Sequence, residues 1–285
     1  MKRSGRKSNI SDWITLHGVM LAVCLLLYPS FMDCISYITQ TSIIGAYEGI
    51  VNELPNEDVD EQLRQAHAYN EKIFKEQQNT DFTYQGEQYV DPLYDAILSV
   101  IDNNQDLIMG YLEIEAINLY LPIAHGTKSE YLQYEAGHIY GTSLPVPTGN
   151  TRAVIAGHTG LKEALLFTNL TKISKGDNFH IHILGHNYSY QVIDIEVVYP
   201  EEADACLQIE PGQDLVTLFT CTPYGVNDHR LLVTGTYVGE EKETSESDEW
   251  VAHQENQKYK IFLVGMLCIP VGIMMIGSCR IRRKE

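Results

Sequence analysis

The chain has 285 residues, of which 44% are hydrophobic and 20% charged, and its formal net charge is −18. These values exclude general disorder, and the acidic balance excludes a nucleic-acid partner, because binding to phosphates needs a basic face. The charge is unevenly spread: both ends are basic, whereas residues 34–258 carry eleven basic and thirty-five acidic side chains. An acidic middle between two basic ends is typical of a protein anchored in a membrane at both ends.

The first predicted element is an apolar helix. A basic cytoplasmic segment, residues 1–13, precedes an apolar stretch over residues 14–35. Such a stretch is either a cleaved signal peptide or a retained signal anchor. No small-residue cleavage site follows it, since Asp33-Cys34-Ile35 fits one poorly. We therefore expect a retained transmembrane helix.

Residues 36–104 are predicted to form a helical N-terminal arm. The segment 58–78 has no glycine or proline, and Leu63, Ala66, Tyr69 and Ile73 recur near helical spacing. This pattern predicts a helix that packs on the main domain. The polar, turn-rich residues 79–90 are predicted to be a loop.

Residues 105–239 have the patterning of short strands separated by Gly- and Pro-containing turns. We expect strands over 110–114, 119–123, 153–158, 178–184, 188–199, 216–221 and 230–238, with one short helix over 161–169. The predicted fold class is therefore mostly β, a closed or nearly closed β-barrel with short helices.

The C-terminal part predicts a second membrane helix. Residues 240–259 form an acidic linker, residues 260–279 an apolar helix, and residues 280–285 a basic tail. The nineteen uncharged residues 261–279 span about 28 Å as a helix, close to the thickness of a bilayer core. The positive-inside rule places both ends in the cytoplasm and the acidic body outside. The predicted localisation is the cell membrane, multi-pass, with the body on the extracellular face.

Two residues suggest nucleophilic chemistry at one end of the barrel. Cys221 ends a predicted strand, and Arg230 begins the next one after an eight-residue loop, so the two residues should face one another at one rim. Only Cys206 and Cys221 among the six cysteines belong to the exported body. Either these two pair in a disulfide or one of them is a free thiol with a chemical role.

A histidine completes a candidate catalytic group. His158 ends its own predicted strand between Gly157 and Gly160. A free thiol is only slightly ionised at neutral pH, and an imidazole within reach raises its reactive fraction and can protonate a leaving amine. A guanidinium beside them can stabilise the oxyanion of an acyl-transfer intermediate.

The motifs around these residues resemble the sortase family. The segment TLFTCTPYGVNDHRLLV (217–233) is similar to the Cys loop of class C, pilin-polymerising sortases, and AGHTG (156–160) to the family's histidine segment. MGYLEIEAINLYLPIAHGT (109–127) and AGHIYGTSLPV (136–146) resemble its first strands and the following loop. The likeness covers residues 105–239, and class C sortases also have two membrane helices and a helical arm.

The resemblance implies a cysteine transpeptidase at the surface of a Gram-positive bacterium. Cys221 would attack the Thr–Gly bond of an LPxTG-like sorting signal, and a lysine amine of the next pilin subunit would resolve the thioacyl enzyme. His158 would be the general acid and base, and Arg230 would hold the substrate or its oxyanion. The implied partners are pilin subunits and the membrane, with no cofactor, and the oligomeric state stays open.

The resemblance also raises the question of a lid. Many class C sortases carry an Asp-Pro-aromatic triplet whose aspartate meets the active-site arginine and whose ring covers the cysteine. This chain has Asp91, Pro92 and Leu93, and the third residue is not aromatic. The triplet is either a lid or a turn that enters the first helix of the body, and Leu93 favours the turn.

Two alternative functions stay open. One is a wall-anchoring sortase that uses a peptidoglycan precursor as its amine, although such enzymes less often have a C-terminal helix. The other is a non-catalytic surface domain with a Cys206–Cys221 disulfide.

The remaining histidines suggest no further site. His180, His182 and His186 lie on a predicted strand and turn, and no cysteine or close carboxylate completes a metal site there. We expect that segment to face solvent. His125 and His138 match no catalytic position of the family and are expected to be structural.

Overall fold

The computed structural model describes residues 10–84, 91–99, 101–102, 107–161 and 165–241. The predicted second membrane helix and the basic tail lie outside the described residues. The residues from Ser36 to Glu243 belong to one compact unit, and residues up to Ile35 to another. The N-terminal part of the first helix is therefore described by itself.

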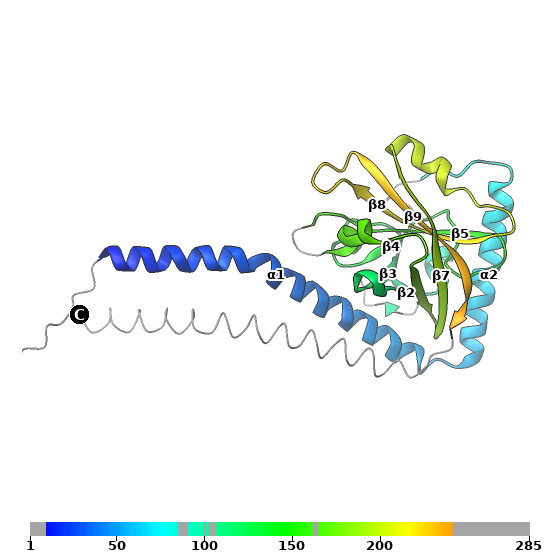
Figure 1. The fold of residues 1–285 in the computed structure, drawn as a ribbon. Helices are drawn as coiled ribbons and strands as arrows, with labels where there is room; N and C mark the ends of the chain where they lie inside the picture. Colours follow the sequence, from blue (N-terminus) through cyan, green and yellow to red (C-terminus); the bar gives the residue numbers. More distant parts are fainter. Residues whose placement is uncertain (1–9, 85–90, 100, 103–106, 162–164, 242–285) are drawn as a thin grey trace, which may run out of the picture. The chain divides into compact units, whose positions relative to one another are not determined.

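The compact unit is built around a closed β-barrel (Figure 1). The strand order is β2-β3-β4-β5-β8-β9-β7-β6, and the pairing of β6 with β2 closes the barrel. Its strands are β2 (Leu107–Ile114), β3 (Leu119–His125), β4 (Ala136–His138), β5 (Thr151–Ala156), β6 (Asn178–Ile183), β7 (His186–Val198), β8 (Asp214–Thr222) and β9 (His229–Glu241). A two-residue strand, β1 (Ile101–Asp102), pairs with the start of β2. The predicted barrel is confirmed.

Most neighbouring strands are antiparallel, but β5 is parallel to β8 and β3 to β4. Almost every residue of β5 is buried, which fits the apolar run 153–156, because strands covered on both faces lose the alternation of polar and apolar residues. The interior face packs Leu112, Leu121, Ile155 and Leu218, all without exposed surface. The outer face of β5 and β8 is therefore covered as well, by segments from outside the barrel.

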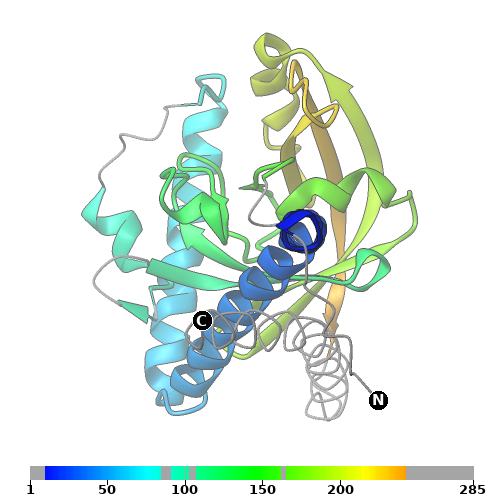
Figure 2. The same cartoon turned by 90° about the vertical axis from the view of Figure 1, so that its left-hand side faces the viewer.

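Short helices connect the strands. They are α3 (Pro92–Ala96), η1 (Glu115–Ile117), η2 (Tyr131–Gln133), η3 (Leu166–Lys172) and η4 (Pro200–Leu207). The helix predicted over 161–169 is observed a few residues later, as η3. Both views show the C-terminal end of α2, η4 and the β8–β9 connection at the same end of the barrel (Figures 1 and 2).

The predicted helix of the arm is confirmed as α2 (Asn56–Gln77). Acidic residues in its first turn and Lys75 in its last turn favour the helix dipole. Its buried face includes Ala66, Tyr69 and Ile73. Asn70, fully buried, donates to the carbonyl oxygens of Leu144 and Val146 and accepts from the Leu144 N–H. These bonds attach the arm to the loop that follows β4.

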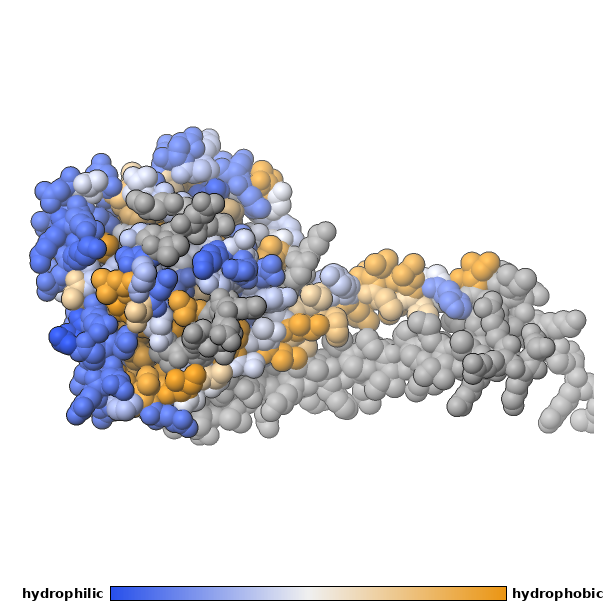
Figure 3. All heavy atoms as spheres, turned by 180° about the vertical axis from the view of Figure 1, so that it is seen from behind, coloured by the Kyte–Doolittle hydropathy of each residue, from blue (hydrophilic) through white to orange (hydrophobic). Residues whose placement is uncertain are grey.

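The first helix, α1, spans Ile10–Val51. Within the described residues, His17–Val51 is the one helical segment long and apolar enough to cross a membrane, with a hydropathy of 1.9. Its exposed apolar side chains are visible in Figure 3. The later part of α1 belongs to the barrel unit, where the Tyr47 hydroxyl donates to the Met109 carbonyl and accepts from the Leu184 N–H.

Candidate active site

The pairing of β8 with β9 brings Cys221 and Arg230 together. The two residues are direct partners in the antiparallel register, one pair before the connection between the strands begins. Directly opposed residues of an antiparallel pair point to the same face of the sheet, with Cβ atoms about 5 Å apart. The sequence-based expectation that these residues face one another at one rim is confirmed.

His158 reaches the same rim from the other side of Cys221. In the parallel pairing of β5 with β8, Val154 lies opposite Thr217 and Ala156 opposite Phe219. The Gly157 N–H donates to the Phe219 carbonyl at 3.1 Å and extends this register beyond the end of β5. Because side chains alternate along a strand, His158 falls on the face that carries Cys221. Three adjacent strands therefore present an imidazole, a thiol and a guanidinium at one end of one face.

A buried threonine fixes the histidine segment against the cysteine strand. The Thr220 hydroxyl donates to the Gly157 carbonyl at 2.6 Å and lies 2.8 Å from the Thr159 hydroxyl. It thus bonds the residues on both sides of His158. Sequence analysis missed this role, since nothing in the chain pairs Thr220 with a segment sixty residues away.

The connection between β8 and β9 is tightly turned. The Thr222–Pro223 peptide is cis, and the Pro223 carbonyl accepts hydrogen bonds from the N–H groups of Val226 and Asn227. The guanidinium of Arg230 donates through Nη1 to the carbonyl oxygens of Asn227, at 3.3 Å, and of His229, at 3.1 Å. The loop backbone therefore holds Arg230 beside the rim.

A ring contact joins the cysteine loop to the histidine loop. A Cβ atom on Gly160 would lie 3.2 Å from the Tyr224 ring, and Gly160 has a φ of +80°. Both facts favour glycine at this position. Tyr224 is itself 66% exposed, so its ring lies next to Gly160 at the surface.

The site is open to solvent. Cys221, His158 and Arg230 are all half-buried. On the loop, the bond from His229 lowers the pKa of Asp228. A strand-end thiol with an imidazole and a guanidinium on the neighbouring strands can attack a carbonyl, supply a proton to the leaving group and stabilise an oxyanion.

The other cysteine of the barrel unit, Cys206, packs against the covered face of the sheet and is unpaired. Cys206 and Cys221 are both free thiols, so the structure contains no disulfide between them. Burial, followed by the charge of Glu196, raises the pKa of the Cys206 thiol. This thiol is therefore less ionised than an ordinary cysteine.

The candidate lid residues lie at the start of α3. Asp91 caps this helix and accepts hydrogen bonds from the N–H groups of Leu93, at 2.9 Å, and Tyr94. Pro92 is the first helical residue, and the side chain of Leu93 is 60% exposed. This geometry is that of a turn entering a helix. A lid role for Asp91, Pro92 and Leu93 stays a prediction.

The predicted solvent-facing histidine segment is partly wrong. His182 is 5% exposed, stacks on Tyr111 and pairs with Glu113 at 3.0 Å, while His186 pairs with Glu240 at 2.7 Å. Both carboxylates come from other strands, which sequence spacing could not show. In the described part of the chain, no three metal-ligating side chains gather in one place.

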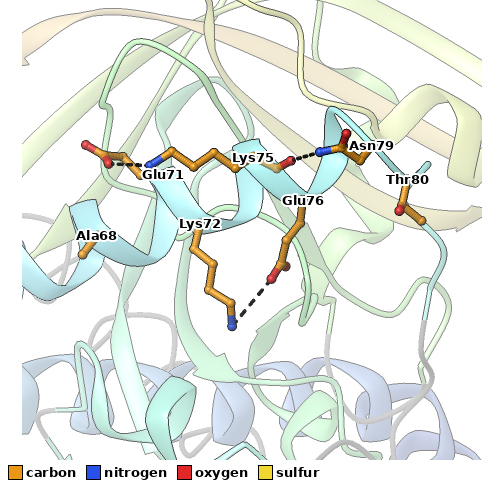
Figure 4. Close-up of a pocket in the computed structure, with 7 residues that line it drawn as sticks. All are labelled: Ala68, Glu71, Lys72, Lys75, Glu76, Asn79 and Thr80. Atoms are coloured by element: carbon orange, nitrogen blue, oxygen red, sulfur yellow. Dashed lines mark hydrogen bonds and ion pairs between the residues drawn. The ribbon is translucent and has the colours of Figure 1, made fainter.

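A depression of about 510 Å³ lies on the exposed side of the C-terminal half of α2 (Figure 4). Its charged side chains are already paired one helical turn apart, Lys72 with Glu76 and Lys75 with Glu71. These are exposed pairs of the kind that contribute little energy and attract little else. We assign this depression no function.

The fold of the barrel unit is shared with a known family of enzymes. The model of the sortase domain matches residues 112–238. Sortase C1 of Streptococcus agalactiae is 36% identical, with a TM-score of 0.63, and the match covers 70% of this chain and 100% of that one. Sortase C-1 of Actinomyces oris is 43% identical, with a TM-score of 0.55, over 64% of this chain and 99% of that one. The curated Sortase A of Bacillus anthracis is 24% identical over 59% of this chain and 77% of its own length. The chain belongs to the sortase family, as a class C sortase, and sortases are cysteine transpeptidases.

Proposed function

We propose that this chain is a membrane-anchored pilin polymerase. It cleaves an LPxTG-like sorting signal through Cys221 and transfers the acyl group to a lysine amine of the next pilin. The observation that carries the assignment is the register that presents His158, Cys221 and Arg230 on one face of three adjacent strands. The pilin-type substrate is supported by the likeness to sortase C of Streptococcus pneumoniae, an enzyme with pilin substrate specificity.

The first half-reaction is an acyl transfer to sulfur. The Cys221 thiol gives its proton to His158, its sulfur attacks the threonine carbonyl carbon, and the carbonyl oxygen takes up the negative charge near Arg230. When the tetrahedral intermediate collapses, the Thr–Gly C–N bond breaks and His158 donates a proton to the leaving amine. The products are a thioester on Cys221 and the released C-terminal segment.

The second half-reaction reverses these roles. A neutral lysine amine attacks the thioester carbonyl, His158 accepts the proton that the amine loses, and the C–S bond breaks. An isopeptide bond forms and the thiol returns to Cys221. Anchoring the enzyme by two helices, with the barrel on the extracellular side, places it among substrates held in the same membrane and raises their effective concentration.

Intact mass spectrometry of the full chain with an LPxTG-like peptide tests this proposal. We expect a mass increase equal to the acyl fragment, mapped to Cys221 and absent from Cys221→Ala. Cys206→Ala is the matched control and keeps the adduct. A lysine-containing pilin peptide should then remove the adduct and yield a branched product. An adduct that persists in Cys221→Ala would disprove the nucleophile, and release only by a peptidoglycan-type amine would disprove the pilin acceptor.

A further inference from the structure

The strand β7 is paired on both sides along its first half and on one side along its second. It lies between β9 and β6 in the sheet. The ladder with β6 ends at Gln191, whereas the ladder with β9 continues to Val198. Among the described residues, no strand pairs with residues 193–198 on the side away from β9, and we call this stretch the free edge. Figure 2 shows it, in yellow-green, running beside β9 toward η4.

One face of the free edge is apolar. Val197 lies opposite Leu231 and Ile195 opposite Val233, so these side chains share a face of the sheet. Leu231 and Val233 are buried in the barrel, whereas Val197 is 58% exposed. The apolar interior of the sheet therefore reaches the surface along the free edge.

The other face of the free edge is continuous with the catalytic rim. Val198 lies opposite Arg230, which in turn lies opposite Cys221. Glu196 stands two residues before Val198, on the same face because side chains alternate, and it is exposed. A strand added here would thus meet apolar side chains on one face and a carboxylate on the face of Cys221.

The free edge ends among further carboxylates. The ring of Tyr199, which follows β7, lies 4.6 Å from the ring of His229, and His229 Nδ1 lies 2.8 Å from Asp228 Oδ1. Glu201 and Glu202 are exposed in the first turn of η4. A cation that approaches along the free edge therefore meets a negatively charged rim.

Protection against chance pairing is confined to the start of this stretch. Exposed edges are usually blunted by bulges, prolines or lysines. A bulge lies between Val192 and Asp194, and Asp194 is paired with Lys175 at 2.7 Å. Residues 195–198 contain no bulge, proline or lysine. Pairing with the same edge of a second copy would bring two Glu196 carboxylates together, and like charges on paired strands are destabilising.

We propose that the free edge is the docking site of the acceptor, a lysine-bearing segment of the next pilin that adds to β7 as an extended strand. Its apolar side chains lie beside Ile195 and Val197, and its basic side chains lie beside Glu196. The reacting lysine follows the docked strand at the rim. This inference rests on the proposed function, because it assigns the free edge to the amine that resolves the thioester on Cys221.

The spacing of the strands fits this route. Neighbouring strands lie about 4.8 Å apart, so a strand added to β7 lies three spacings, about 14 Å, from the strand of Cys221. Two extended residues cover about 7 Å, and the flexible four-carbon stem of a lysine covers much of the rest. A lysine one or two residues beyond the docked strand can therefore cross β9 and reach the thioester. The bonds formed and broken are those of the second half-reaction.

Aminolysis of the acyl enzyme tests the docking site. The full chain, in detergent, is acylated with an LPxTG-like peptide, and loss of the adduct is followed by intact mass. The probe is an acetylated octapeptide in which valine and lysine alternate, and Nα-acetyl-lysine amide reports the chemistry without docking. The quantity compared is the ratio of the two rates. An octapeptide with four valines followed by four lysines should react about tenfold more slowly than the alternating one, because it cannot match both faces.

Substitutions on the free edge should lower this ratio. Val197→Lys should lower it about tenfold, because a lysine on an edge strand opposes strand addition. Val238→Lys is the matched control: Val238 is 54% exposed at the opposite end of β9 from Arg230, and the ratio should stay unchanged.

A charge reversal tests the acidic face separately. Glu196→Lys should lower the ratio about fivefold, because an exposed charge pair is replaced by a repulsion. Glu130→Lys makes the same change of charge at an exposed position before η2 and should leave the ratio unchanged.

Amide hydrogen exchange locates the bound peptide. In the full chain carrying Cys221→Ala, the alternating octapeptide should slow exchange within residues 193–198, because the added strand pairs with their backbone. The peptide with separate blocks of valine and lysine should not. Exchange in β6, which already has a strand on each side, should not change.

The outcomes distinguish the inference from the proposed function. Equal rate ratios in Val197→Lys and Val238→Lys, with no protection of residues 193–198, would overturn the inference while the adduct on Cys221 still forms and reacts with Nα-acetyl-lysine amide. Protection that grows with enzyme concentration in the absence of peptide would assign the free edge to a second copy and would also overturn it. Protection by the alternating peptide without any acyl adduct would instead overturn the role of Cys221 and leave the docking site in place.

Discussion

The barrel holds histidines in two contrasting places. His158 lies just beyond the end of β5, half-buried, with glycines close by. His125 and His138 lie opposite one another on β3 and β4, 4% and 0% exposed. A histidine at a strand end is thus available for chemistry, whereas the two histidines within the strands are enclosed. Position in the sheet, and not residue type, distinguishes a candidate catalyst from a structural group.

Of the two enclosed histidines, His138 belongs to a hydrogen-bonded network beneath α3, and His125 contacts that network through its ring. The Tyr94 hydroxyl lies 2.6 Å from His138 Nδ1, and His138 Nε2 lies 2.7 Å from the Ser143 carbonyl. The Tyr94 ring contacts His125 edge to face, with centroids 4.8 Å apart. Such a network stabilises the fold as long as every polar group keeps its partner.

The largest expected effect is on catalysis at the rim. His158→Ala should lower kcat/KM for an LPxTG-like peptide by about 10²- to 10⁴-fold, because proton transfer to the leaving amine is lost. Arg230→Ala should cost about 10²- to 10³-fold through the oxyanion. Steady-state cleavage assays measure both, with thermal unfolding as the control for folding. Near-normal turnover in either variant would remove that residue from the mechanism.

In contrast, His138→Ala should lower the stability of the fold and leave the catalytic activity unchanged. It removes the buried imidazole that bonds the Tyr94 hydroxyl and the Ser143 carbonyl, at a cost of about 3 kcal/mol. For a domain of this size the Tm should fall by roughly 6–12 °C, while the folded enzyme keeps its kcat/KM. The exposed His67→Gln should change neither. A loss of activity without a loss of stability would contradict the structural role.

Acid should destabilise the fold by protonating the two enclosed histidines, His125 and His138. Burial, with the neighbouring His138, lowers the pKa of His125 to about 3, and burial lowers the pKa of His138 to about 4. Both values lie below the ordinary value of 6.5, so the unfolded chain binds more protons between about pH 4 and pH 6.5. The stability present above pH 6.5 is therefore lost as the pH falls through this window.

Chemical denaturation between about pH 7 and pH 4.5 measures this loss. Each buried histidine adds up to about 1.4 kcal/mol per pH unit to the slope. His125→Phe should flatten the slope, whereas His67→Gln should not. An equal slope in wild type and His125→Phe would show that other groups carry the acid sensitivity.

Sequence patterning predicted the long elements and the rim of the site. The apolar runs of β5 and β8 and the loop from Cys221 to Arg230 are local signals, and the glycine- and proline-free segment 58–78 predicted α2. The strand β4 was not predicted, because the three residues Ala136–His138 are too few to show an alternation of polar and apolar side chains. The register of β5 against β8, which brings His158 to Cys221, depends on pairing across sixty residues and has no local signal.

Residues 80–84, which follow α2, show the same limit more sharply. Residues 79–90 are polar and turn-rich, so Phe82 was predicted to lie in a loop, and its burial depends on Gln208, 126 residues away. His182 was likewise predicted to face solvent. The prediction failed because its partner Glu113 comes from another strand. In both cases a single side chain is buried by an element that the local sequence does not reveal.

The smallest expected effect concerns the ring contact between the two loops at the rim. Gly160→Ala introduces a Cβ atom 3.2 Å from the Tyr224 ring at a φ of +80°. Gly212 has a φ of +83° with open space around it, so Gly212→Ala carries the same backbone cost without the contact. Both variants should lose about 1 kcal/mol of stability. Only Gly160→Ala should also lower kcat/KM, by a few-fold, because Tyr224 must shift and the loop after His158 moves with it. Equal kcat/KM values in the two variants would mean that the ring of Tyr224 does not position the histidine.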